Sequence, residues 1–473
     1  MWADLQTGNL KQATADVVLE NAKAKLSPEL QALTFKNIAG RLAVKSVPNG
    51  FDFSTEGLRF DTEDGLHWPG GNVNVTYTET ESSLAAQGRF QGDKLDLLAL
   101  RNIALQLPLP QNTRDVLQAH KVTGTVNALH LEWSAQKTAE GTNYKVNTAN
   151  GNIEKLNFEG GQAGSSTETW PGIENANVIF EMNADGGQIK ANIEQGALSV
   201  NRIFEEPRIS LDKMQASVKW LQQKGQITVP DWQLSLSNAD VAGSWQGHWK
   251  PSAAPNSLGY LELQGNIVRA NANKVYRYLP LGISQNARNY VRDSVLSGTV
   301  QNVAVKIKGD LNKLPFANPK DGEFRFAGKV NDVQYAYVPV PSLPSASSST
   351  AIKQNPAETS WPVMNNVTGD IVFDRFNFKV NGATGKWGNT PFTQIKAEIP
   401  NLSNNLVVNV QGESKSSAKQ LLTDLRFSPV NNMLGGVLTQ ASSTGNVSSR
   451  LKLSIPLGAI DKTTLQGLSL IHI

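Results

Sequence analysis

The sequence contains no cysteine and only five histidines in 473 residues. The absence of cysteine excludes disulfide frameworks, thiolate metal sites and cysteine nucleophiles. The histidines lie far apart, and no two of them have the spacing of a metal-ligand pair; they are His67, His120, His130, His248 and His472. The sequence also lacks the glycine-rich and serine motifs of nucleotide-binding and hydrolytic enzymes. It therefore predicts no metal, no cofactor and no enzymatic activity.

Charge and long apolar runs are also scarce. Charged residues make up 18% of the chain and the formal net charge is +3, so no basic surface for nucleic acid is expected. No stretch approaches the ~18 consecutive apolar residues of a membrane-spanning helix, and the N-terminus does not resemble a signal peptide. We expect this chain to be part of a longer protein, truncated at both ends, with any membrane anchor outside it. We also expect no closing strand after Leu451–Ile455, and we expect the last few residues to be non-native.

Alternation of apolar and polar residues recurs along most of the chain, as in Val303–Lys308 and Leu451–Ile455. This period of two is typical of strands with one buried face. Turn signals such as Asn49-Gly50 separate the runs. The pattern predicts a mostly β protein, a long twisted antiparallel sheet that forms an elongated open groove, with a few short edge helices. The polar stretches 160–168, 250–257 and 339–350 are predicted to be exposed loops.

Internal repeats divide the chain. Thr123-Gly124-Thr125-Val126 returns as Ser297-Gly298-Thr299-Val300 and, more weakly, as Thr444-Gly445-Asn446-Val447. Such recurrence indicates a repeating β architecture. We predict three units, at residues 1–135, 136–312 and 313–473, of which the last is truncated and contains the Pro/Ser-rich loop 339–350.

A short helix is expected before the Gly-containing strand of each unit. In the second unit, Ser284 is positioned to cap a helix with Ala287, Tyr290 and Val291 on one face. In the third, Ser417 is positioned to cap one that turns Leu421, Leu422 and Leu425 inward. We expect these helices to brace one edge of the sheet.

A long sheet with one apolar face must close on itself, pack on a second sheet, meet lipid or hold an apolar ligand. A phospholipid crossing water exposes about 30 methylenes, a penalty on the order of 20 kcal/mol that an apolar groove would remove. We interpret the partner as phospholipid acyl chains. The candidate groove residues are Val303, Val305, Ile307, Leu451, Leu453 and Ile455, with Lys306, Lys308 and Lys452 on the outside.

Ten tryptophans leave a second hypothesis open, a secreted or surface β-repeat adhesin or glycan-binding protein, because stacked aromatic rings can hold sugars. Trp232, Trp245 and Trp249 lie close together in the sequence. Three others precede proline at repeat positions, where a role in starting a strand is the simpler interpretation; they are Trp68, Trp170 and Trp361.

Several segments together resemble the YhdP family of AsmA-like proteins over nearly the whole chain. They are Gly259–Gly265, Val275–Pro280, Ser297–Val300, Trp361-Pro362 and Arg450–Leu457. The resemblance implies a taco-shaped β groove that spans the periplasm and moves phospholipid between the inner and outer membranes of a Gram-negative bacterium. It also implies an inner-membrane anchor and an outer-membrane end supplied by regions missing here, and no catalytic residues.

Overall fold

A computed structural model describes residues 1–6, 9–24, 33–80, 85–105, 111–138, 141–162, 169–252, 257–339, 361–403, 406–456 and 462–472. Of the loops predicted at 160–168, 250–257 and 339–350, the parts 163–168, 253–256 and 340–350 lie outside these residues. Within the described parts, Gly161–Gln162 forms a short strand and Lys250 is the last residue of another. The described chain forms two compact units, Met1–Arg202 with Glu206–Leu236, and Ile203–Glu205 with Ser237–Ile473. The division into three repeat units stays a prediction.

Strands dominate both units. Of the 26 strands in the described residues, 24 share one sheet, and every strand pairing described is antiparallel. Among these residues β1 pairs only with β2, and β26 only with β25. The prediction of a mostly β chain built on a long antiparallel sheet with a few short helices is confirmed.

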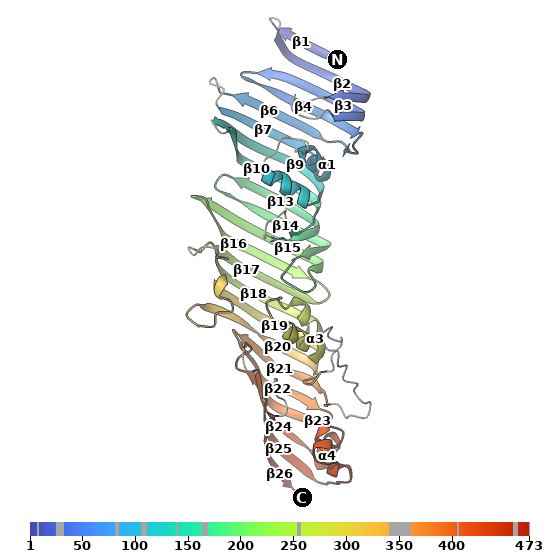
Figure 1. Cartoon of the computed structure of the whole chain (residues 1–473), viewed down its shortest axis with the longest axis vertical. Coiled ribbons are helices and arrows are strands. Elements are labelled where there is room, and N and C mark those ends of the chain that lie inside the picture. The colour runs from blue at the N-terminus through green and yellow to red at the C-terminus, as the bar shows by residue number, and fades with distance from the viewer. Residues whose placement is uncertain are drawn as a thin grey trace. The chain divides into compact units, whose positions relative to one another are not determined.

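The first unit is a run of strands that follow one another across the sheet in chain order (Figure 1). Its elements are β1 (Trp2–Gln6), β2 (Asn9–Ala24), β3 (Leu33–Val47), β4 (Gly50–Thr62), β5 (His67–Trp68), β6 (Asn72–Glu79), β7 (Ala85–Asp93), β8 (Leu95–Asp96), α1 (Leu97–Leu105), α2 (Gln111–Ala119), β9 (Val122–Thr138), β10 (Gly141–Phe158), β11 (Gly161–Gln162), β12 (Thr169–Trp170), β13 (Gly172–Asn183), β14 (Gly186–Ser199), β15 (Arg208–Gln223) and β16 (Gln226–Ser237).

The second unit is also a meander, in which each strand from β17 to β26 pairs with the next. Its elements are β17 (Val241–Lys250), β18 (Tyr260–Asn271), η1 (Ala272–Tyr278), α3 (Gln285–Ser294), β19 (Val295–Asp310), η2 (Leu311–Lys313), β20 (Gly322–Tyr335), β21 (Met364–Asp374), β22 (Asn377–Trp387), β23 (Thr390–Ile399), β24 (Val407–Ser417), α4 (Ala418–Arg426), α5 (Pro429–Met433), η3 (Val437–Thr439), β25 (Asn446–Pro456) and β26 (Thr464–His472).

Bulges interrupt many strands without changing the face that their apolar residues occupy. In β19, Asn302 adopts a left-handed conformation with φ of 52°, and the register with β20 shifts between Gln301 and Ala304. The extra residue places Val300 and Val303, three positions apart, in one apolar cluster. The same spacing recurs at Ile153/Leu156, Ile173/Ala176, Val330/Val333, Val380/Ala383 and Phe392/Ile395, each pair flanking a residue with positive φ.

The predicted helix caps are present. The Ser284 side chain accepts a hydrogen bond from the Ala287 amide at the start of α3, and the Ser417 side chain accepts one from the Gln420 amide at the start of α4. Both helices lie at the same end of the strands of the second unit (Figure 1). The buried Asp424 carboxylate fastens α4 to the sheet, since it accepts a hydrogen bond of 2.5 Å from Thr390 Oγ1.

The sequence prediction for the end of the chain was wrong. No strand was expected after Leu451–Ile455, yet Thr464–His472 forms β26, with Gly467 opposite Leu451. A strand that begins about ten residues later pairs with the free backbone groups of β25. The alternation of apolar and polar residues in this strand is weak, because Leu468, Leu470 and Ile471 lie close together in the sequence near its end.

Candidate functional site

The candidate site is the apolar face of the sheet in the second unit, from β18 to β25. One cluster of buried side chains on this face, each at most 8% exposed, is centred on β19; its members are Ala272, Val300, Val303, Val305 and Val333. Partly buried side chains of strands β18 to β21 pack around them, among them Leu263, Ile267, Ile307, Phe326 and Ile371.

Strand β19 shows how the two faces are separated. Val303 and Val305 are buried, and Ile307 packs against the same cluster. The intervening lysines point to the other face, where Lys306 Nζ lies 2.8 Å from Glu323 and Lys308 Nζ lies 3.0 Å from Glu262. Because successive side chains of a strand point to opposite faces, alternating apolar and charged residues give the sheet one apolar face and one charged, solvent-exposed face.

Strand pairing brings the two groups of candidate residues onto one face. Residues directly opposite each other in neighbouring strands share a face. Successive cross-strand partners of Val305 form a line of apolar residues across the sheet: Phe326, Phe373, Phe378 and Ile399. Ala397 lies two positions before Ile399 in the same strand and therefore on the same face. From Ala397 the line continues through Val410 to Leu453. Leu451, Leu453 and Ile455 therefore lie on the same sheet face as Val303, Val305 and Ile307. They are partly buried, and Lys452 between them is exposed.

Three phenylalanines on this face were not among the candidates from the sequence. Phe324 and Phe326 lie two positions apart in β20 with ring centroids 5.1 Å apart, and Phe373 of β21 lies 5.7 Å from Phe324. Their alternation in Phe324-Arg325-Phe326 is the signal that could have identified them. The rings extend the apolar face over β20 and β21.

The first unit carries two apolar clusters of its own. One joins Leu66, Trp68, Leu95 and Val126 to Ala99 of helix α1. The other is formed by strands β13 to β15, with its best-covered residues at Ala176, Val178, Ile193, Leu211 and Met214. The first unit therefore also has apolar sheet surface, part of which α1 covers.

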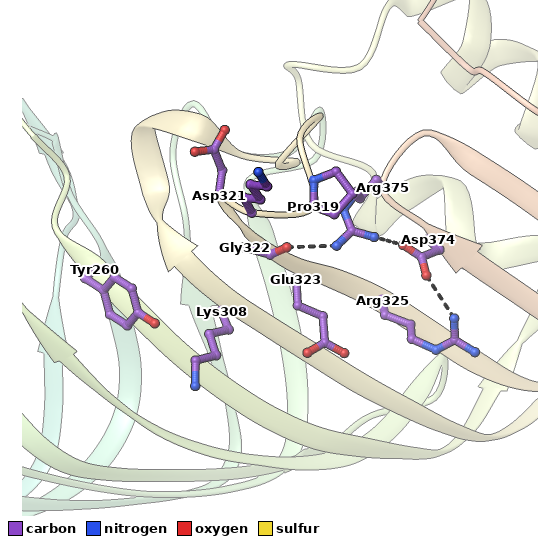
Figure 2. A pocket seen from close by; sticks show the side chains of 10 residues that line it. Tyr260, Lys308, Pro319, Asp321, Gly322, Glu323, Arg325, Asp374 and Arg375 are labelled. Atoms are coloured by element: carbon purple, nitrogen blue, oxygen red, sulfur yellow. Dashed lines mark hydrogen bonds and ion pairs between the residues drawn. The ribbon is translucent and has the colours of Figure 1, made fainter.

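A polar hollow of about 700 Å³ lies on the opposite, charged face of the second unit (Figure 2). Its charged groups neutralise one another, since Asp374 pairs with both Arg325, at 2.9 Å, and Arg375, at 2.5 Å. Arg375 also donates to the Gly322 carbonyl oxygen, and Lys308 is paired with Glu262, whose carboxyl pKa it lowers through a hydrogen bond. No single sign of charge is left to attract a ligand, so this hollow is not the candidate site.

Several tryptophans are occupied by packing within the sheet. The indoles of Trp133, Trp220 and Trp245 each lie over a glycine in the neighbouring strand, where a methyl group would overlap the ring. The glycines opposite them are Gly88, Gly187 and Gly265. Trp249 Nε1 donates to the Leu258 carbonyl oxygen at 2.9 Å. These contacts fill the space that a glycine leaves in a strand, a structural role for tryptophan.

Within the described residues, no group of three or more histidine or acidic side chains is placed to hold a metal ion. His67, His130 and His248 each approach a single carboxylate, while the His120 ring packs against Phe158 with the ring centroids 5.0 Å apart. In the same part of the chain, no helix is both long enough and apolar enough to cross a membrane.

The fold and the site define an open antiparallel β-sheet protein whose second unit has one charged and one apolar face. The model of the YhdP protein family matches residues 1–469, and the chain belongs to this family. The chain is 21% identical over 475 residues to the intermembrane phospholipid transporter YhdP of Escherichia coli K12. That match covers 96% of this chain and 34% of the relative, so the chain spans about a third of its length. No solved structure matches.

Proposed function

We propose that this chain is a segment of a hydrophobic conduit that carries phospholipid between the inner and outer membranes of a Gram-negative bacterium. The acyl chains lie along the apolar sheet face, and the head group stays in water. The segment acts in the periplasm, and other regions of the protein supply an inner-membrane anchor and an outer-membrane end.

The observation that carries the proposal is the apolar line from Val305 to Leu453 across seven strands, β19 to β25. Each methylene kept out of water is worth about 0.8 kcal/mol. A surface that stays apolar from strand to strand offers a lipid the same environment at every step. The lipid can then advance with little change in free energy. A conduit of this kind needs a flat energy profile and no chemical step.

The family relative supports the choice of cargo, because it is named as an intermembrane phospholipid transporter. The proposed absence of catalysis rests on the same family membership. A glycan-binding function is not favoured, because Trp245 and Trp249 are held by contacts within the sheet.

Site-specific photocrosslinking of the whole protein in cells tests the proposal. A photoreactive amino acid at Leu453 should form phospholipid adducts, detected by mass spectrometry. The same amino acid at the neighbouring Lys452, on the charged face, is the matched control and should form few. Equal adduct yields at both positions, or none at Leu453, would contradict a conduit on this face.

A further inference from the structure

The apolar face of the second unit ends in a group of aromatic side chains. Tyr335 of β20 is opposite Met364 of β21, which is opposite Trp387 of β22. Tyr335 packs against the same apolar cluster as Val333, two positions earlier in its strand. We call Tyr290, Tyr335, Tyr337, Trp361 and Trp387 the aromatic margin. Tyrosine and tryptophan combine an apolar ring with a polar tip, which suits the boundary between apolar surface and water.

Hydrogen bonds connect these side chains across three elements. The hydroxyl of Tyr290, on α3, donates to the Tyr337 carbonyl oxygen at 3.1 Å and lies 2.8 Å from the hydroxyl of Tyr335. A hydroxyl has one hydrogen, so Tyr335 is the donor in the second bond. Trp387 Nε1 donates to the Tyr337 hydroxyl oxygen at 2.9 Å. Trp361 packs on the Tyr337 ring, with centroids 6.0 Å apart.

In this arrangement the hydroxyl hydrogen of Tyr337 is not donated to any described residue. The Tyr337 hydroxyl oxygen accepts from Trp387, and no acceptor for its own hydrogen is present among the residues that the structure describes. Burial raises the pKa of Tyr337 to about 12, so the hydroxyl remains a donor at physiological pH. Once acyl chains cover this region and exclude water, a donor without an acceptor is costly, and a ligand that supplies an acceptor is stabilised.

The chemistry of the margin selects the acceptor. Its five members are all uncharged, whereas a phosphate group is bound best by arginine or lysine. An ester carbonyl is neutral and only accepts hydrogen bonds. In a diacyl lipid the ester groups lie where the acyl chains meet the head group, so they are adjacent to apolar surface when the chains rest on it.

We propose that the aromatic margin is a subsite for the ester region of a diacyl phospholipid, in which the Tyr337 hydroxyl donates to an ester carbonyl oxygen. The subsite rests on the proposed function, because the acyl chains of the same lipid occupy the apolar face. It fixes the depth of each lipid on the sheet by its ester groups, so that head groups of different chemistry are accepted.

The test compares a short-chain phosphatidylglycerol carrying two octanoyl esters with its ether-linked analogue, which lacks both carbonyl groups. Binding to the full chain is measured by titration. The wild type should prefer the ester lipid by about fivefold, the ratio that a net hydrogen bond of about 1 kcal/mol gives. Tyr337→Phe should remove this preference and keep the affinity for the ether lipid. Tyr260→Phe, on the charged face, is the control and should retain the preference.

Equal wild-type affinity for the two lipids would overturn the subsite while leaving the conduit intact, and this comparison needs no variant. Retention of the preference by a folded Tyr337→Phe variant would also overturn it. Failure of the wild type to bind either lipid would overturn both the subsite and the proposed function.

Discussion

Asn366 Nδ2 donates a hydrogen bond of 2.6 Å to Asp332 Oδ1, and the bond joins the bulges of two neighbouring strands. Both residues are in the left-handed region, with φ of 53° for Asn366 and 52° for Asp332. Short polar side chains tolerate this conformation better than other L residues. The bulge residues therefore support one another across the exposed face while the apolar residues beside them stay on the other face.

Asn366 tests the importance of this backbone conformation. Asn366→Gly keeps the conformation and loses one hydrogen bond, a cost of about 1 kcal/mol at most. Asn366→Val places a β-branched residue at positive φ and should cost about 1–2 kcal/mol more. Urea unfolding of the two variants measures the difference. Equal stability of the glycine and valine variants would show that the bulge is not held in this conformation.

The packing of Trp245 on Gly265 can be tested by adding a single methyl group. Gly265→Ala places a methyl group against the indole and the neighbouring backbone, and overpacking of this kind costs about 1–3 kcal/mol. Gly282→Ala is the matched control, because a methyl group there has no neighbour within 4 Å. Thermal unfolding should show a lower melting temperature for the first variant only. An unchanged melting temperature in Gly265→Ala would mean that Trp245 does not occupy this position.

The Glu262–Lys308 pair predicts a pH dependence. A hydrogen bond from Lys308 lowers the pKa of Glu262 from its ordinary value of 4.5. A lowered carboxyl pKa adds stability that is fully present above 4.5 and is lost as the pH falls through the pKa of the folded protein. Lys308→Gln should therefore raise the pKa of Glu262, seen by carboxyl NMR, and the stability difference from wild type should shrink under acid. A difference that grows below the pKa would contradict the pairing.

Much of the fold can be predicted from the sequence. In β19, the alternation places Val303, Val305 and Ile307 on one face of the sheet and Lys306 and Lys308 on the other. The helix caps at Ser284 and Ser417 are equally local signals. The bulges are harder to predict, since Gln394 and Lys155 adopt positive φ although their residue types do not favour it.

The aromatic margin could not be predicted from the sequence. Tyr290, Tyr337 and Trp387 lie far apart in the chain and belong to a helix, a connecting segment and a strand. Their hydrogen bonds depend on where the segment after β20, which contains Tyr337, lies relative to α3 and to the end of β22. Contacts between distant segments leave no periodic pattern, so only the structure shows them.

The most direct test of the central claim places one carboxylate on each face of β19 and measures phospholipid transport. Val305→Asp puts the charge on the apolar face, and Ala304→Asp puts it on the exposed face one residue away. A carboxylate among apolar side chains and acyl chains costs several kcal/mol, so Val305→Asp in the whole protein should slow delivery of labelled phospholipid to the outer membrane at least about tenfold. Ala304→Asp should transport at the wild-type rate. A Val305→Asp protein that folds, accumulates normally and transports at the wild-type rate would contradict the account.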